Sequence, residues 1–168
     1  TIWNVWQNGI QTNLITSLSN YPEELKVRQT ESITSILQSK GLTNYASITP
    51  SIASKISQKL DANVFIYGNI NKAGTTILVN AQLIDSKTQD APKSFQMDGT
   101  AENILHMIDS LSLMIKDYLI ISELKKDLSL DIQQFVTTTS PEAFKYYIYG
   151  NNSFAKRDFA RSYSMVFT

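Results

Sequence analysis

The stretch ANVFIYGNINKAGTTILVNAQLID, residues 62–85, decides the fold of this chain. Val64 to Tyr67 are apolar at consecutive positions, which is typical of a strand buried on both faces. The following Asn-Lys-Ala-Gly supplies a turn in which Gly74 can adopt a positive φ. Beyond the turn, apolar and polar side chains alternate, which predicts a second strand with one buried face. A third, edge-like strand over residues 93–98 would complete a three-stranded antiparallel meander.

Helices are predicted before this meander. A stripe of apolar residues at helical spacing predicts a helix over residues 3–18, and it consists of Trp3, Trp6, Ile10, Leu14 and Leu18. Thr30 and Thr49 are predicted to cap two further helices, because a threonine hydroxyl accepts a backbone N–H and Pro50 suits a first helical turn. Between these helices, residues 24–29 alternate apolar and charged side chains, which indicates a short strand.

A long helix is predicted after the meander, beginning near Thr100 with Thr100 or Asp98 as its cap. Its apolar stripe would cover the sheet and consists of Ile104, Leu105, Ile108, Leu111, Ile115 and Leu119. The predicted fold class is therefore α/β of the α+β kind. In it, helices cover a mixed sheet of at least four strands that contains the antiparallel meander.

Composition excludes several classes of function. Fifteen basic and fifteen acidic residues cancel, and without a basic excess we expect no direct nucleic-acid partner. The chain has no cysteine, which excludes disulfides and thiolate chemistry and fits either side of a bacterial membrane. No apolar run approaches the roughly 20 residues that a membrane span needs. We favour the cell envelope over the cytoplasm as the compartment.

Titratable residues suggest no catalytic or metal site. His106 is the single histidine and falls away from the apolar stripe, so a solvated side chain is expected. The acidic candidates are better explained as turn residues or as a solvated helix face, and they are Glu23, Glu24, Asp85, Asp90, Asp98, Asp109 and Asp117. Gly68 and Gly74 match no phosphate-binding motif. We therefore predict no enzyme activity, no catalytic or metal-binding residues and no cofactor.

The order of elements, together with the pattern LDANVFIYGNINKAGTTILVNAQLIDSKTQ, resembles a bacterial module similar to the TolB amino-terminal domain and to FlgO-type proteins. The resemblance covers roughly residues 3–120 and contains no catalytic residues. Members of that family begin with a strand ending in Pro-Phe, which this chain lacks. We therefore expect the chain to be a fragment of a longer protein, with its sheet one strand short.

A second resemblance lies in the tail. TTSPEAFKYYIYGNNSFAKRDFARSYSMVF is similar to the first unit of a tetratricopeptide (TPR) array, in which paired helices interlock small and aromatic residues. Ser153 and Ser162 depart from that pattern, and a plain helical hairpin is the alternative. The expected domains are therefore a TolB-like domain over residues 1–136 and an incomplete TPR-like repeat over 137–168, with the boundary at about 136–140.

These resemblances imply a non-enzymatic regulatory or scaffolding segment of a bacterial signalling protein. A protein or peptide partner would bind through the TPR region. The alternative is a domain that senses a small molecule in a pocket between the sheet and a helix. Converging polar groups near Asn69, Asn80 and Gln82 would favour that alternative.

Overall fold

The computed structural model describes residues 2–42, 48–126, 128, 133–134 and 137–155. By contacts the chain divides into two compact units, Thr1–Met114 and Ile115–Thr168. The described elements follow the order α1 (Ile2–Ser19), α2 (Thr30–Ser39), α3 (Pro50–Lys59), β1 (Val64–Ala73), β2 (Thr76–Asp85), β3 (Lys93–Thr100), η2 (Ala101–Asn103), α4 (Ile104–Lys125) and α6 (Pro141–Ala155). The α+β fold class is confirmed. The predicted boundary at 136–140 stays a prediction.

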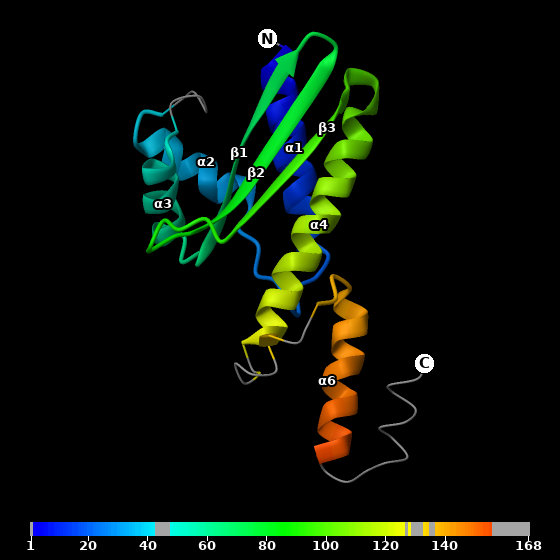
Figure 1. Ribbon diagram of the computed structural model, residues 1–168. Helices are drawn as coiled ribbons and strands as arrows, with labels where there is room; N and C mark the ends of the chain where they lie inside the picture. The colour runs from blue at the N-terminus through cyan, green and yellow to red at the C-terminus, as the bar shows by residue number, and fades with distance from the viewer. Residues whose placement is uncertain (1, 43–47, 127, 129–132, 135–136, 156–168) are drawn as a thin grey trace. The chain divides into compact units, whose positions relative to one another are not determined.

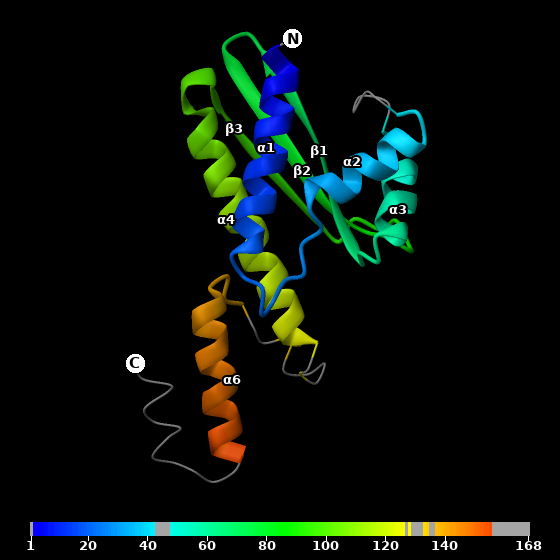
Figure 2. The same ribbon diagram turned by 180° about the vertical axis from the view of Figure 1, so that it is seen from behind.

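The first unit is built on the predicted meander. Its three strands lie in the order β1-β2-β3 and pair antiparallel throughout. Figures 1 and 2 show α1 and α4 on one face of this sheet, while α2 and α3 lie beside β1. On β2, the central strand, Ile77, Val79, Ala81 and Leu83 are all buried, so the predicted alternation is confirmed.

The residues around the sheet explain where the helices begin and end. The Thr49 hydroxyl accepts the N–H of Ile52 at 3.3 Å, which confirms the predicted cap of α3. For α2 the predicted cap was wrong: Gln29 is the N-cap and Thr30 is already helical. Gly41 follows the end of α2 with φ at +69°, a conformation that glycine adopts without strain.

The strand predicted at 24–29 is wrong. Residues 25–29 form no strand, so the sheet of the described residues has three strands and is not mixed. Arg28 instead donates hydrogen bonds to the carbonyl oxygens of Leu60 at 2.6 Å and Asp61 at 2.7 Å. A guanidinium placed at these carbonyls stabilises the C-terminal end of α3. The alternating residues 24–29 therefore form a connecting segment, and the hydrogen bonds of Arg28 attach it to the end of α3.

The expected double burial of β1 is also wrong. Among the described residues β1 pairs with β2 alone, so it is an edge strand, and Val64 is 40 % exposed. The end of β2 is held to α3 instead: Ser54 Oγ donates to the carbonyl oxygen of Ser86 at 2.7 Å, and Gln58 donates to the same oxygen. Apolar runs therefore do not distinguish an edge strand from a central one.

The long helix differs in its first turn from the expectation. Thr100 precedes the short 3₁₀ turn η2 without a side-chain capping bond, and α4 begins only at Ile104. Leu105 was placed on the apolar stripe but is 65 % exposed, whereas Met107 is buried. Asn13 of α1 joins α4 by donating to Asp109 at 3.1 Å. Leu119, another residue of the stripe, is only half-buried.

The second unit contains the rest of α4 and helix α6. Phe144 is fully buried, and its ring stacks on that of Tyr147 with centroids 6.3 Å apart. Ser140 directly precedes α6, and its hydroxyl accepts the N–H of Ala143 at 3.3 Å, as a capping residue does. The second helix of the expected hairpin falls on residues 156–168, outside the described residues. The side chain of Trp3 also lies outside them.

The turn between β2 and β3 yields a prediction about pH. The Asp85 carboxylate accepts the N–H groups of Thr88 and Lys87, both at 2.8 Å, and these bonds lower its pKa. A carboxyl whose pKa is lower in the folded chain stabilises the fold above its unfolded pKa of about 3.9. That contribution is lost as the pH falls through the lower, folded value.

We therefore expect Asp85→Asn to lower the melting temperature at neutral pH. The difference from the unchanged protein should shrink as the pH falls from about 4 through the lower pKa of the folded carboxyl, where Asp85 itself becomes protonated. Thermal unfolding followed by circular dichroism across this pH range measures the effect. Asp90→Asn removes the same charge from the same turn and is the control. A difference that stays constant with pH would contradict the assignment.

Candidate functional site

The open face of the sheet, opposite α1 and α4, is the candidate site. Strand register arranges its side chains in two rows that cross all three strands. Tyr67 pairs with Gln82, which pairs with Ser94, and these three form the first row. The second row consists of Asn69, Asn80 and Gln96, which pair in the same way. Residues two apart on a strand share a face, so the two rows stand side by side.

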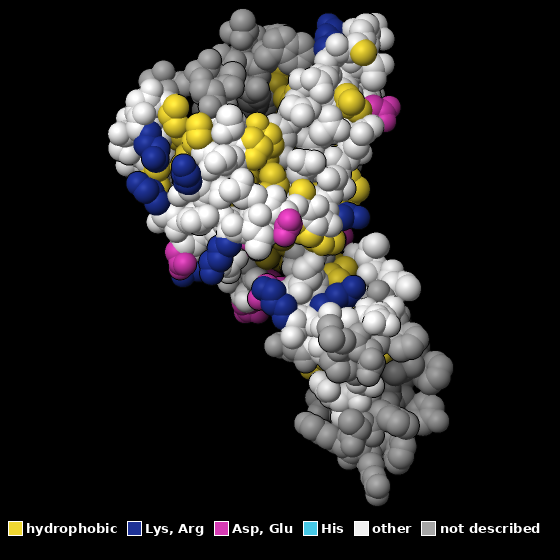
Figure 3. Space-filling view, turned by 60° about the vertical axis from the view of Figure 1, so that its left-hand side comes forward, with side chains coloured by type: hydrophobic (Ala, Val, Ile, Leu, Met, Phe, Trp, Pro, Cys, Tyr) yellow, Lys and Arg dark blue, Asp and Glu magenta, His cyan; other side chains and the backbone are white. Residues whose placement is uncertain are grey.

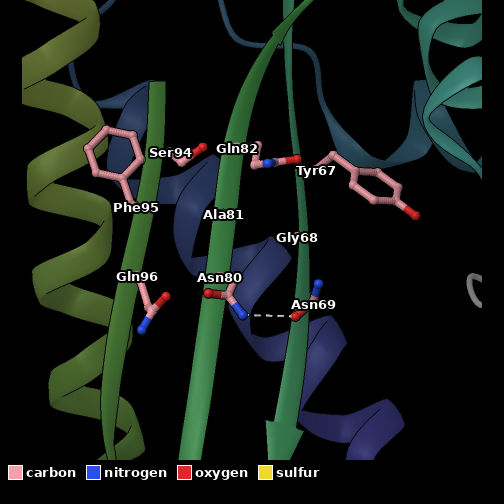
Figure 4. A pocket seen from close by; sticks show the side chains of 9 residues that line it. All are labelled: Tyr67, Gly68, Asn69, Asn80, Ala81, Gln82, Ser94, Phe95 and Gln96. Atoms are coloured by element: carbon pink, nitrogen blue, oxygen red, sulfur yellow. Dashed lines mark hydrogen bonds between the residues drawn. The ribbon is translucent and has the colours of Figure 1, made fainter. Parts of the chain in front are cut away.

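A hollow of about 380 Å³ lies between the two rows. Its floor is formed by Gly68, Ala81 and Phe95, which are partners in register and lie one residue from each row. Figure 4 shows the row residues around this floor, with the Phe95 ring directed away from it. We call the hollow together with its two rows the trough. Its volume falls within the range of about 300–1,000 Å³ of known ligand pockets.

The trough brings together the three residues that the sequence associated with a pocket. Asn80 Nδ2 donates to Asn69 Oδ1 at 3.1 Å, and Gln82 lies in the adjacent row. Every lining residue comes from the sheet, so the trough does not lie between the sheet and a helix. Sequence reasoning missed Ser94 and Gln96. Their alternation with Phe95 and Met97 was the available signal, because it places them on the face opposite to those apolar residues.

The hydrogen bonds of the trough leave several polar groups available. Asn69 Oδ1 accepts a second bond from Asn71 at 2.9 Å, and the Tyr67 hydroxyl donates to the carbonyl oxygen of Ile48 at 3.1 Å. Within the part of the chain that the structure describes, the side chains of Gln82, Ser94 and Gln96 have no hydrogen-bond partner. An amide offers two donor hydrogens and an acceptor oxygen, so the trough can recognise groups of either kind.

Among the described residues that line the trough, none has a charged side chain. The side of the molecule drawn in Figure 3 is mostly backbone and uncharged polar side chains, with charged groups scattered in small sets. The Lys93 ammonium lies over the Phe95 ring at 5.6 Å from its centroid, and that ring is directed away from the hollow. A charged ligand group placed in the trough would lose water without gaining a counter-charge, which costs free energy.

The structure separates the acidic residues considered from sequence. The Asp85 carboxylate accepts a backbone N–H of its own turn, from Lys87. Asp98 pairs with Leu78 further along the sheet. Asp117 forms an ion pair with the buried Lys116 at 2.8 Å. Among the described residues, no group of three or more metal-ligating side chains lies close together. His106 is exposed on α4, as expected.

Comparison with known proteins finds two solved structures of bacterial lipoproteins. The C-terminal domain of LpoB from Salmonella enterica is 17 % identical, with a TM-score of 0.40 over 45 % of this chain and 57 % of that one. Lipoprotein GNA1162 from Neisseria meningitidis is 19 % identical, with a TM-score of 0.39 over 61 % of this chain and 74 % of that one. This chain thus spans little more than half of the LpoB domain.

These scores are too low for the two likenesses to carry an argument about function. No protein-family model and no curated protein matches this chain. The resemblances to the TolB amino-terminal domain and to a TPR unit therefore stay predictions. No helix within the described residues is both long and apolar enough to cross a membrane.

Proposed function

We propose that this chain is a non-enzymatic interaction segment of a bacterial envelope protein and that it docks a partner protein on the open face of its sheet. The trough is the observation that carries this proposal. Its rows present amide and hydroxyl groups from three strands on a rigid, paired scaffold. Polar groups held by regular strands need little reordering on binding, which reduces the entropic cost of association.

The positions of the acidic side chains support a binding role over a catalytic one. Asp85 is engaged by two backbone N–H groups, Asp109 by Asn13 and Asp117 by Lys116. Each of these carboxylates thus has a structural contact. Asp85 lies on β2, while Asp109 and Asp117 lie about two turns apart on α4. Catalytic acid–base pairs require groups that converge on one cleft.

The second part of the proposal concerns α6. It covers the first half of the TPR-like sequence, and its side chains at Tyr146, Tyr147 and Tyr149 are 52 %, 43 % and 54 % exposed. Exposed tyrosines are enriched where proteins bind one another. We propose that α6 opens a helical repeat region of a signalling protein and that this region binds a second, peptide-like partner.

Photo-crosslinking tests the docking role of the sheet. A photoreactive amino acid replaces Gln96 in the trough and, as the control, exposed Thr12 on α1. We expect Gln96 alone to capture a specific partner in the native host. Binding of that purified partner should weaken about tenfold with Gln82→Lys, since a charge would enter an uncharged interface. Equal capture at both positions, or unchanged affinity, would refute the role.

A small neutral molecule is a second candidate ligand. The observation that favours it is the convergence of Asn69, Asn80 and Gln82 on one hollow of suitable volume. In that case a screen of neutral metabolites should raise the melting temperature of the protein. The increase should disappear in Ser94→Trp, whose indole would fill the trough.

A further inference from the structure

We propose that the trough binds a short extended peptide segment with uncharged side chains, which crosses the strands between the two rows. The proposal rests on the docking function above and identifies the part of the partner that is recognised. It depends on the spacing of the rows, the length of the trough, its polar groups and its lack of charge.

The spacing of the rows selects an extended chain. Neighbouring rows on one face of a sheet are separated by two residues, or about 7 Å. This width admits one extended chain but not a helix, whose diameter with side chains is about 10 Å. The trough crosses three strands that are spaced by about 4.8 Å, so its length is about 10 Å and matches roughly three extended residues.

The polar groups match a peptide backbone. Each peptide unit offers one donor and one acceptor, and Gln82 and Gln96 offer both kinds of group on opposite sides of the trough. Ser94 adds a hydroxyl at the β3 end. Asn69 and Asn80 bond to each other, which holds the carbonyl oxygen of Asn80 and the amino group of Asn69 available to a ligand.

The aromatic residues argue against sugars and nucleobases, whose rings are commonly held on exposed aromatic faces. Figure 4 shows that the Tyr67 ring points away from the trough. Its hydroxyl donates a hydrogen bond to the carbonyl oxygen of Ile48, outside the trough. Phe95 is 9 % exposed and directed toward the covered face of the sheet. Neither ring offers a stacking platform, and the uncharged lining disfavours ionic peptides as well.

Peptide display tests the proposal with the purified chain. The purified chain selects from a library of random peptides of about seven residues, which are longer than the roughly three residues that the trough holds. We expect selection of uncharged polar peptides, which are then synthesised with capped ends and measured by fluorescence polarisation. Gln82→Ala combined with Gln96→Ala should weaken binding at least about tenfold. Gln38→Ala, an exposed glutamine on α2, should leave it unchanged.

Three outcomes would overturn the proposal. They are selection of charged peptides, equal binding by the double variant, and selection of the same peptides on Ser94→Trp, in which the trough is filled. Circular dichroism confirms that each variant is folded. If the Gln96 crosslink captures a partner while no peptide binds the trough, the docking function stands and this inference alone fails.

Discussion

Gly68→Ala is expected to destabilise the first unit by about 3 kcal/mol, at the upper end of the usual cost of overpacking. A Cβ atom at this position would lie 2.4 Å from the backbone carbonyl oxygen of Asn80 on the neighbouring strand. That oxygen belongs to the paired backbone of β2 and cannot move without disturbing the ladder. Urea unfolding followed by circular dichroism measures the loss.

Gly99→Ala is the matched control for this prediction. Its added Cβ would meet the sulfur of Met107 at 2.7 Å, at the flexible end of a side chain that can change rotamer. We expect a cost of no more than about 1 kcal/mol there. If the two variants unfold at the same urea concentration, the close approach at Gly68 does not exist in solution. Because Gly68 also forms part of the trough floor, its variant should weaken partner binding too.

Leu83→Ala should cost about 3 kcal/mol of unfolding free energy, as buried leucines commonly do. Leu83 is 1 % exposed on the central strand β2, on the face opposite to that of Gln82. Truncation removes apolar contacts and leaves a cavity between elements that cannot fully collapse. Chemical unfolding measures the change, and the open face should keep its register in the folded fraction.

Leu105→Ala makes the same chemical change on the surface and is the control. Leu105 is 65 % exposed at the start of α4, so its truncation should alter stability by less than about 0.5 kcal/mol. The pair also tests the corrected apolar stripe of that helix. A large loss at Leu105 together with a small one at Leu83 would reverse the assignment of buried faces.

The sequence predicted several local features correctly, although the caps expected at Thr30 and Thr100 are absent. Periodicity identified α1 and the alternating strand β2, and Thr49 with Pro50 marked the start of α3. Residues 25–29 had the same alternation as a strand but found no neighbouring strand, because pairing depends on distant partners. The burial of Val64 was misjudged for the same reason, since an apolar run does not reveal its place in the sheet.

The candidate site was predicted in part. The tight turn at Gly74 fixes the hairpin register, which is why Asn69 and Asn80 could be expected to meet. Ser94 and Gln96 were missed because the longer β2–β3 connection leaves the register of the third strand open from sequence alone. The close approach of Gly68 to the backbone of Asn80 is likewise a tertiary property that the sequence does not reveal.

Within the described part of the chain, each strand of the meander pairs only with a strand that is its neighbour in the sequence. Such a sheet has a low contact order. Closing its short loops therefore loses little conformational entropy, and its hairpins can form within about 1–10 μs. The meander can therefore fold during synthesis, once α4 has emerged to cover its apolar face. A nascent polypeptide still attached to the ribosome would already display the surface that we propose for docking.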